Sequence, residues 1–110
     1  MIIDLKKLPV KTMVNFNGGE KELVTNMFVD DAGNKIFCGK LVPGASIGLH
    51  THETSCEVIY VLKGKGIVLY DGEYEDVSEG LCHYCPKGHS HSLINNSDED
   101  LIFFAVVPVQ

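Results

Sequence analysis

Three histidines and a glutamate are the residues of this chain best suited to chemistry: His50, His52, Glu57 and His91. On a strand, His50 and His52 would point to the same face, with side chains about 6–7 Å apart along the chain. Three imidazoles and one carboxylate suit a divalent Mn, Fe, Co, Ni, Cu or Zn ion, whereas Mg and Ca prefer oxygen donors. The four residues therefore predict a transition-metal site with one or two coordination positions left for another ligand.

Each of these residues has a plainer interpretation when it is taken alone. A His-x-His pair on a strand is more often exposed polar surface than a metal site, because short motifs match by chance. Glu57 alone would be a solvated residue at a strand edge, and His91 alone a hydrogen-bonded core histidine. Only the joint pattern favours metal binding.

The composition describes an ordinary globular chain. With 110 residues, 45% of them hydrophobic and 22% charged, we expect one domain over residues 1–110 with a modest core. The formal net charge of −6 argues against extended contact with nucleic acid or an anionic membrane. It does not exclude an anionic ligand, because a bound metal supplies local positive charge.

Neither end of the chain resembles a targeting or membrane segment. Residues 1–7 carry an early acid and no apolar stretch of the kind that a signal peptide needs. The longest apolar run, residues 101–107, is far shorter than the ~20 residues that span a bilayer. We therefore expect a cytoplasmic protein with reduced cysteines.

Short β-rich runs separated by turns make up most of the chain. Strands are expected at 23–29, 36–42, 57–62, 67–70, 74–77, up to 85, 91–94 and 101–107. Asp71-Gly72 favours a type I′ hairpin turn. Many short strands at regular spacing predict an all-β sandwich or closed barrel. The first twenty residues carry no clear prediction.

The residues around the four candidate ligands follow two motifs. The first reads Gly, five residues, His-x-His, three or four residues, Glu, six residues and Gly; it is matched by Gly44, His50, His52, Glu57 and Gly64. The second reads Gly, five residues, Pro-x-Gly, two residues, His, three residues and Asn; it is matched by Gly80, Pro86, Gly88, His91 and Asn95. With motifs at 44–64 and 80–95, the chain resembles the cupin superfamily, in particular its small single-domain conserved-barrel members.

The resemblance implies a fold, a cofactor and a ligand set. The fold would be the cupin double-stranded β-helix, a jelly-roll barrel, with a divalent transition metal near its centre. Residue by residue, the metal ligands would be His50, His52, Glu57 and His91. Small cupins commonly pair, so we also expect a homodimer.

Two positions distinguish this chain within the superfamily. Leu81 stands where an Asp commonly follows the glycine that opens the second motif, and that Asp is usually structural. Glu57 argues against the thiol dioxygenase branch, which keeps only the three histidines. The glycines at 64, 80 and 88 are expected in turns that need positive φ.

The remaining histidines and cysteines carry weaker predictions. His89 is expected to be an exposed turn histidine rather than a proton shuttle, and either His83 or Tyr84 could face the pocket. The lone Cys82-x-x-Cys85 lacks the second pair of a structural zinc site, so two buried strand cysteines are expected, and Cys56 is expected to be a buried thiol. Five apolar residues are expected in the core or a dimer interface: Phe37, Ile59, Val61, Phe103 and Phe104.

Three functions remain open from the sequence. The intact ligand set favours a metal-dependent enzyme acting on a small oxygenated molecule, such as a carboxylate or a sugar derivative. The alternative is a non-catalytic module that binds a sugar or small acid. A folded barrel with a vestigial metal site ranks last, and the fold itself does not choose among these functions.

Overall fold

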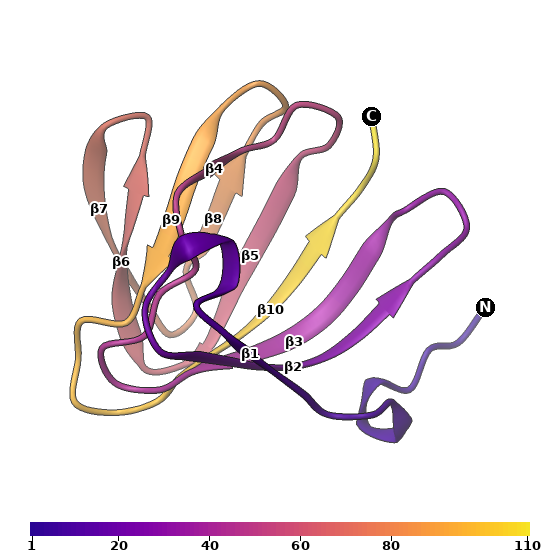
Figure 1. Cartoon of the computed structure of the whole chain (residues 1–110), viewed down its shortest axis with the longest axis horizontal. Coiled ribbons are helices and arrows are strands. Elements are labelled where there is room, and N and C mark those ends of the chain that lie inside the picture. The colour runs from indigo at the N-terminus through magenta and orange to yellow at the C-terminus, as the bar shows by residue number, and fades with distance from the viewer.

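Two antiparallel sheets hold nearly all of the regular structure. A computed structural model describes residues 1–110. Six strands form one sheet in the order β1-β2-β3-β10-β5-β8, and four form the other in the order β4-β9-β6-β7. Figure 1 shows the four-stranded sheet at the left and the six-stranded sheet curving away beneath it to the right. This is the all-β jelly-roll arrangement predicted from the sequence.

The elements have the following bounds. The strands are β1 (Lys11–Val14), β2 (Glu22–Val29), β3 (Lys35–Leu41), β4 (His50–Thr51), β5 (Glu57–Lys63), β6 (Lys65–Tyr70), β7 (Glu73–Ser78), β8 (Cys82–Cys85), β9 (Ser90–Ile94) and β10 (Leu101–Val107). Two short 3-10 helices are η1 (Leu5–Lys7) and η2 (Phe16–Gly18). The predicted strands agree with these bounds to within a residue or two, whereas β1 and β4 were not predicted.

Alternation of side chains along the central strands builds the core. In β10 every second residue, from Leu101 through Phe103 and Ala105 to Val107, is buried. β10 lies between β3 and β5, so its inward residues meet those of both neighbours. The Phe103 ring lies over Gly39, where a Cβ atom would come within 2.4 Å of the ring. It also meets the Phe37 ring edge to face, with centroids 6.0 Å apart.

Turns with positive φ connect the strands as expected. Asp71 and Gly72 have φ values of 47° and 85°, which are the two positive angles that a type I′ turn requires. Gly64, Gly80 and Gly88 also have positive φ, between 88° and 89°. Gly64 has a second constraint, because a Cβ atom there would lie 2.6 Å from the Asp100 carbonyl oxygen.

The N-terminal segment is attached to the barrel by backbone hydrogen bonds. β1 pairs with β2, and the Gly48 amide donates to the Phe16 carbonyl oxygen. Gly48 and Gly19 pass so close to neighbouring backbone that neither has room for a Cβ atom. The segment therefore lies directly against residues 46–48, which lead into β4. No helix of the structure has the length and apolar character needed to cross a membrane.

Candidate metal centre

Three separate strand regions bring the predicted site residues together. β4 pairs with β9 so that His50 lies directly opposite His91. His52 lies just past the end of β4, where its amide donates to the His89 carbonyl oxygen and its own carbonyl oxygen accepts from the Gly88 amide. Glu57 is the first residue of β5, in the other sheet. The site thus lies where the two sheets face each other.

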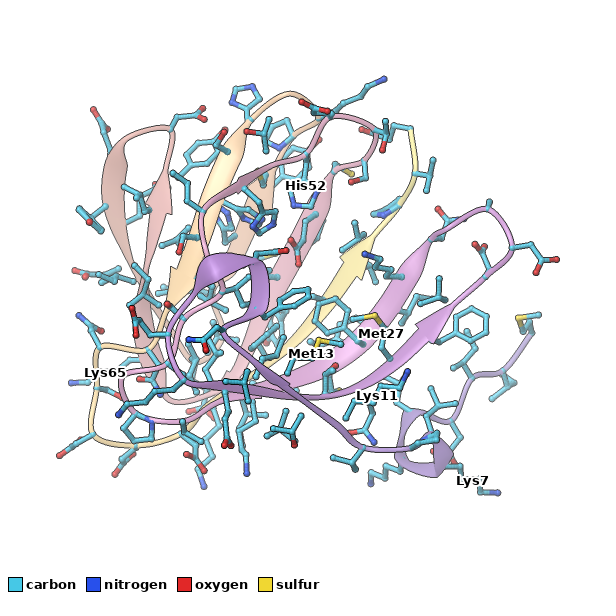
Figure 2. The ribbon with its side chains drawn as sticks, in the orientation of Figure 1. Lys7, Lys11, Met13, Met27, His52 and Lys65 are labelled. Carbon is cyan, nitrogen blue, oxygen red and sulfur yellow. The ribbon has the colours of Figure 1, made fainter.

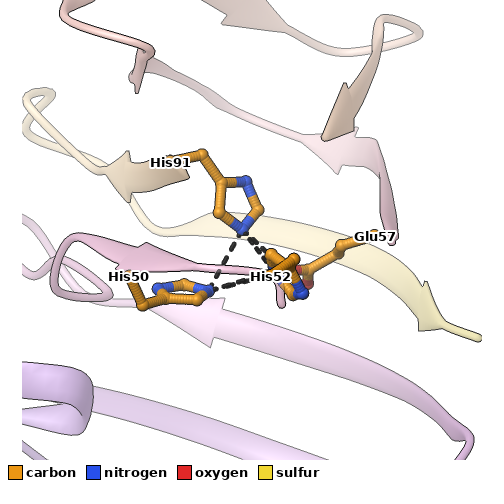
Figure 3. A group of neighbouring side chains, drawn as sticks. All are labelled: His50, His52, Glu57 and His91. Atoms are coloured by element: carbon orange, nitrogen blue, oxygen red, sulfur yellow. Dashed lines mark hydrogen bonds and ion pairs between the residues drawn. The ribbon is translucent and has the colours of Figure 1, made fainter. Parts of the chain in front are cut away.

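The ligand atoms of these four residues converge on one point (Figure 3). The three histidine Nε2 atoms form a triangle: His50 to His52 is 3.2 Å, His52 to His91 is 2.9 Å, and His91 to His50 is 3.1 Å. Glu57 Oε1 lies 3.1 Å from His52 Nε2 and 2.9 Å from His91 Nε2, but 4.0 Å from His50 Nε2.

These separations fit six-coordinate geometry. Two donors about 2.1 Å from an ion lie about 3.0 Å apart at adjacent corners of an octahedron, about 4.2 Å apart at opposite corners, and about 3.4 Å apart in a tetrahedron. Five of the six separations lie between 2.9 and 3.2 Å, and the His50–Glu57 separation is 4.0 Å. The separations are therefore short enough for all four atoms to bind one ion, and they lie closer to those of a six-coordinate site than to those of a tetrahedral one.

Each of the three histidines has a partner for its other ring nitrogen. His50 Nδ1 donates to the Gly48 carbonyl oxygen at 2.7 Å, which leaves Nε2 as a lone-pair donor. His52 Nδ1 lies 2.8 Å from the Ser55 hydroxyl oxygen, and His91 Nδ1 lies 3.0 Å from His83 Nε2. Such outer partners fix the tautomer and the ring orientation of histidines that bind metals.

Electrostatics keep the site ready for a cation. Burial by itself raises the pKa of Glu57, but the close contacts of its carboxylate with the His52 and His91 rings outweigh burial and lower the pKa to about 2. Burial lowers the pKa of His50 by more than its hydrogen bond to the Gly48 carbonyl oxygen raises it. A carboxylate that stays charged and an imidazole that stays neutral near pH 7 are the forms that bind a metal.

His83 is a residue of this site whose role the sequence left open. It lies on β8, with its ring buried and stacked on that of His91 at a centroid distance of 5.2 Å. Tyr84, its neighbour on the strand, faces outward and is exposed. The strand pairing Ile59↔His83 places His83 on the inward face, but pairing register is a property of the fold that sequence motifs do not encode.

Loss of the His83 ring nitrogen is expected to weaken metal binding. His83→Phe keeps a ring of similar shape but leaves His91 Nδ1 without its acceptor, so we expect a 10- to 100-fold loss of metal affinity, as is typical for outer partners. His83→Gln retains an acceptor and should lose less. Competition with a chromophoric chelator measures both variants, and equal affinities for native protein and His83→Phe would contradict this role.

A cavity of about 430 Å³ opens beside the candidate ligands. Its apolar wall is formed by Phe16, Met27, Phe37, Ile47 and Val107. Its polar lining comprises Asn17, Lys35, Thr51, Ser55 and the side chains of His50, His52 and Glu57. Figure 2 shows Met27 and His52 on the same side of the six-stranded sheet. The N-terminal segment, whose structure was not predicted, thus supplies two lining residues, Phe16 and Asn17, through η2.

The structure separates the remaining candidates from the site. The His89 ring is 44% exposed and bonds to Asp71 and Tyr70, as expected for a turn histidine. Cys56 is buried, as predicted. Of the two cysteines expected to be buried in β8, Cys85 is buried but Cys82 is exposed, because residues three apart on a strand face opposite sides. All four cysteines are free thiols.

Comparison with known proteins finds relatives that agree with this fold. A family model described as "Cupin domain" matches residues 39–107. An oxalate-binding protein of Thermotoga maritima is 30% identical over 112 residues, which cover 97% of this chain and 93% of the relative. The crystal structure of a predicted oxalate decarboxylase from T. maritima matches with a TM-score of 0.87 and 27% identity, covering 100% of both chains.

A more distant solved structure shares the fold. The polyketide cyclase RemF from Streptomyces resistomycificus matches with a TM-score of 0.77 and 21% identity, covering 100% of this chain and 83% of that one. At this identity the likeness concerns the fold alone. The family model and the 30% identical relative each span well over half of the chain, and together with the barrel and its three-histidine, one-glutamate cluster they show that this chain belongs to the cupin family.

Proposed function

We propose that this protein binds one divalent transition metal through His50, His52, Glu57 and His91 and uses it to act on a small carboxylate. The proposal rests on the convergence of one ligand atom from each of the four residues, three imidazole nitrogens and one carboxylate oxygen, on one point. These four residues would hold the ion, and a six-coordinate ion held by four protein donors would have two positions for a ligand. Two oxygen atoms of a dicarboxylate or a hydroxy acid would suit those positions.

The relatives support a carboxylate over a sugar. The T. maritima relative is named an oxalate-binding protein, and oxalate is a two-carbon diacid that chelates metals. When bound, the metal would supply Lewis-acid polarisation of the ligand's oxygen atoms. The chain would contribute the apolar cavity wall, which keeps water from the bound ligand and so strengthens electrostatic interactions. Because Phe16 and Asn17 line this cavity, we propose that residues 1–110 act as one functional unit.

Calorimetric titration with oxalate tests this function. Protein loaded with Mn²⁺ should bind about one oxalate per chain, and the same protein stripped of metal should bind at least 100-fold more weakly, because the two chelating positions belong to the ion. Equal oxalate affinity with and without metal would reject the proposal. Assay of the loaded protein for loss of oxalate, with product analysis, then tests for turnover.

A binding protein without turnover is the second candidate. Apart from the proposed ligands, Lys35 is the one ionisable side chain that lines the cavity. Proton transfer in decarboxylation needs a positioned acid or base, so a lining with so few such groups favours binding. Stoichiometric oxalate binding that leaves the oxalate unchanged over many hours would place the protein in this class.

We also propose a homodimer, formed through the outer face of the six-stranded sheet. Two rows of outward residues cross this face without a charged side chain; they are Phe28, Ile36, Val106, Val58 and Tyr84 in one row and Asn26, Cys38, Phe104, Tyr60 and Cys82 in the other. These residues are half-buried or exposed in the single chain. An uncharged, largely apolar patch commonly marks an interface, and a twofold pair is self-complementary. Sedimentation should show a dimer at micromolar concentration and a monomer for Tyr60→Glu. A native monomer at that concentration would reject the interface.

A further inference from the structure

Lys35 lies in the same row of the six-stranded sheet as Glu57. Lys35 pairs with Val107 across β3 and β10. On the other side of β10, Val106 pairs with Val58, and the Cys56 amide donates to the Pro108 carbonyl oxygen. This register places Glu57 opposite Val107. All three side chains line the cavity. Two strand spacings separate the Lys35 and Glu57 backbones, a distance of about 10 Å.

The charge of Lys35 has no partner in the protein. The ion pairs of the structure involve Glu57 and Asp71 as the acids, and neither is paired with Lys35. Glu57, the one acidic residue of the cavity lining, has its carboxylate turned to the three imidazoles. Lys35 is half-buried at the cavity wall, and no acidic side chain lies within ion-pair distance of its ammonium group. A bound anion would supply a counter-ion.

The cavity is larger than a two-carbon diacid requires. Oxalate has six non-hydrogen atoms and, at no more than about 30 Å³ each, fills at most about 180 Å³. The cavity measures about 430 Å³, and its lining includes the apolar residues Phe37, Ile47 and Val107, of which Val107 lies between Lys35 and Glu57 in the sheet. This space suits a short aliphatic segment between a chelating end and an anionic end.

We propose that Lys35 binds the distal carboxylate of a four- or five-carbon diacid whose other end, a carboxylate with an adjacent oxygen, chelates the metal. This inference rests on the proposed function, since it takes the metal as one of the two anchors. Lys35 acts here as a specificity residue: it favours longer hydroxy- or oxo-diacids over monoacids of the same length. The ammonium–carboxylate contact is a charge-assisted hydrogen bond in a partly apolar site, where such contacts are strongest.

Matched acids that differ only at the distal end test this role. The probes are malate against 2-hydroxybutyrate and 2-hydroxyglutarate against 2-hydroxyvalerate, each titrated calorimetrically into Mn²⁺-loaded protein. In the native protein at least one diacid should bind about tenfold tighter than its monoacid. Lys35→Gln should reduce that ratio to about one, and Lys35→Arg should retain most of it.

Lys40→Gln is the control variant. Lys40 lies on the same strand, β3, but at odd spacing from Lys35, so it faces the other side of the sheet, opposite Ile102 of β10. Lys40→Gln should leave the diacid preference unchanged, and all variants should retain native metal content. A diacid preference that is absent from the native protein, or that survives in Lys35→Gln, would overturn the inference while leaving oxalate binding intact. If the native protein bound no acid more tightly with metal than without it, the proposed function would be overturned instead.

Discussion

His91→Ala is expected to weaken transition-metal binding by more than about 100-fold, beyond the loss that removal of an outer partner causes. His91 is the most central of the three histidines. Its Nε2 atom lies 2.9 Å from both His52 Nε2 and Glu57 Oε1 and 3.1 Å from His50 Nε2. Alanine removes one of four donors and leaves a space behind it, because the His91 side chain is fully buried.

His89→Ala is the matched control for this variant. His89 is two residues away and half-exposed, and its side chain bonds to Asp71 and Tyr70 rather than to the candidate ligands. Its backbone, which pairs with His52, is unchanged by the substitution. Competition titrations with Mn²⁺ and Co²⁺ compare the two variants. Native affinity in His91→Ala, or an equal loss in both variants, would contradict the assigned ligand set.

Phe103→Ala is expected to lower the free energy of unfolding by about 3–5 kcal/mol. Phe103 is fully buried between Gly39, Phe37 and the residues of β5, so alanine leaves a cavity that the rigid central strands cannot close. Such a loss is a large fraction of the 5–15 kcal/mol that is typical of a small domain. Chemical denaturation of the metal-free protein measures it without the contribution of metal binding.

Phe104→Ala provides the comparison, because the adjacent residue faces the opposite side of β10. Phe104 is half-buried on the outer sheet face, between Cys38 and Tyr60. Its truncation should cost about 1 kcal/mol in a dilute monomer, which is an average effect for a point substitution. A smaller loss for Phe103→Ala than for Phe104→Ala would contradict the inward and outward assignment of β10.

The strands were predictable from short-range patterns, and the ligand cluster was predictable from two motifs that match those of the cupin superfamily, although the contact between His50 and His91 joins strands far apart in the chain. Turn residues such as Asp71-Gly72 mark where strands end, and the two motifs carry their ligands at set distances from turn glycines. From the sequence, Phe103 and Phe104 were equivalent apolar residues. Once β10 is paired with β3 and β5, Phe103 is buried in the core and Phe104 lies on the outer face.

The residues that the sequence did not assign depend on contacts between distant segments. His83 meets His91 because β8 folds back beside β5, and Lys35 lines the cavity because β10 joins β3 to β5. Phe16 reaches the cavity because its carbonyl oxygen is held by the Gly48 amide. Each of these contacts follows from strand order, which is a long-range property that local spacing does not determine.

Elemental analysis of the purified native protein, after reloading with Mn²⁺ and removal of free ion, shows whether the four residues hold a metal ion. We predict close to one transition-metal ion per chain. Electron paramagnetic resonance of the Mn²⁺-loaded sample should report a six-coordinate ion whose signal changes when oxalate is added. Less than about a tenth of an ion per chain after reloading, in protein that is folded by circular dichroism, would contradict the assignment of His50, His52, Glu57 and His91 as a metal centre.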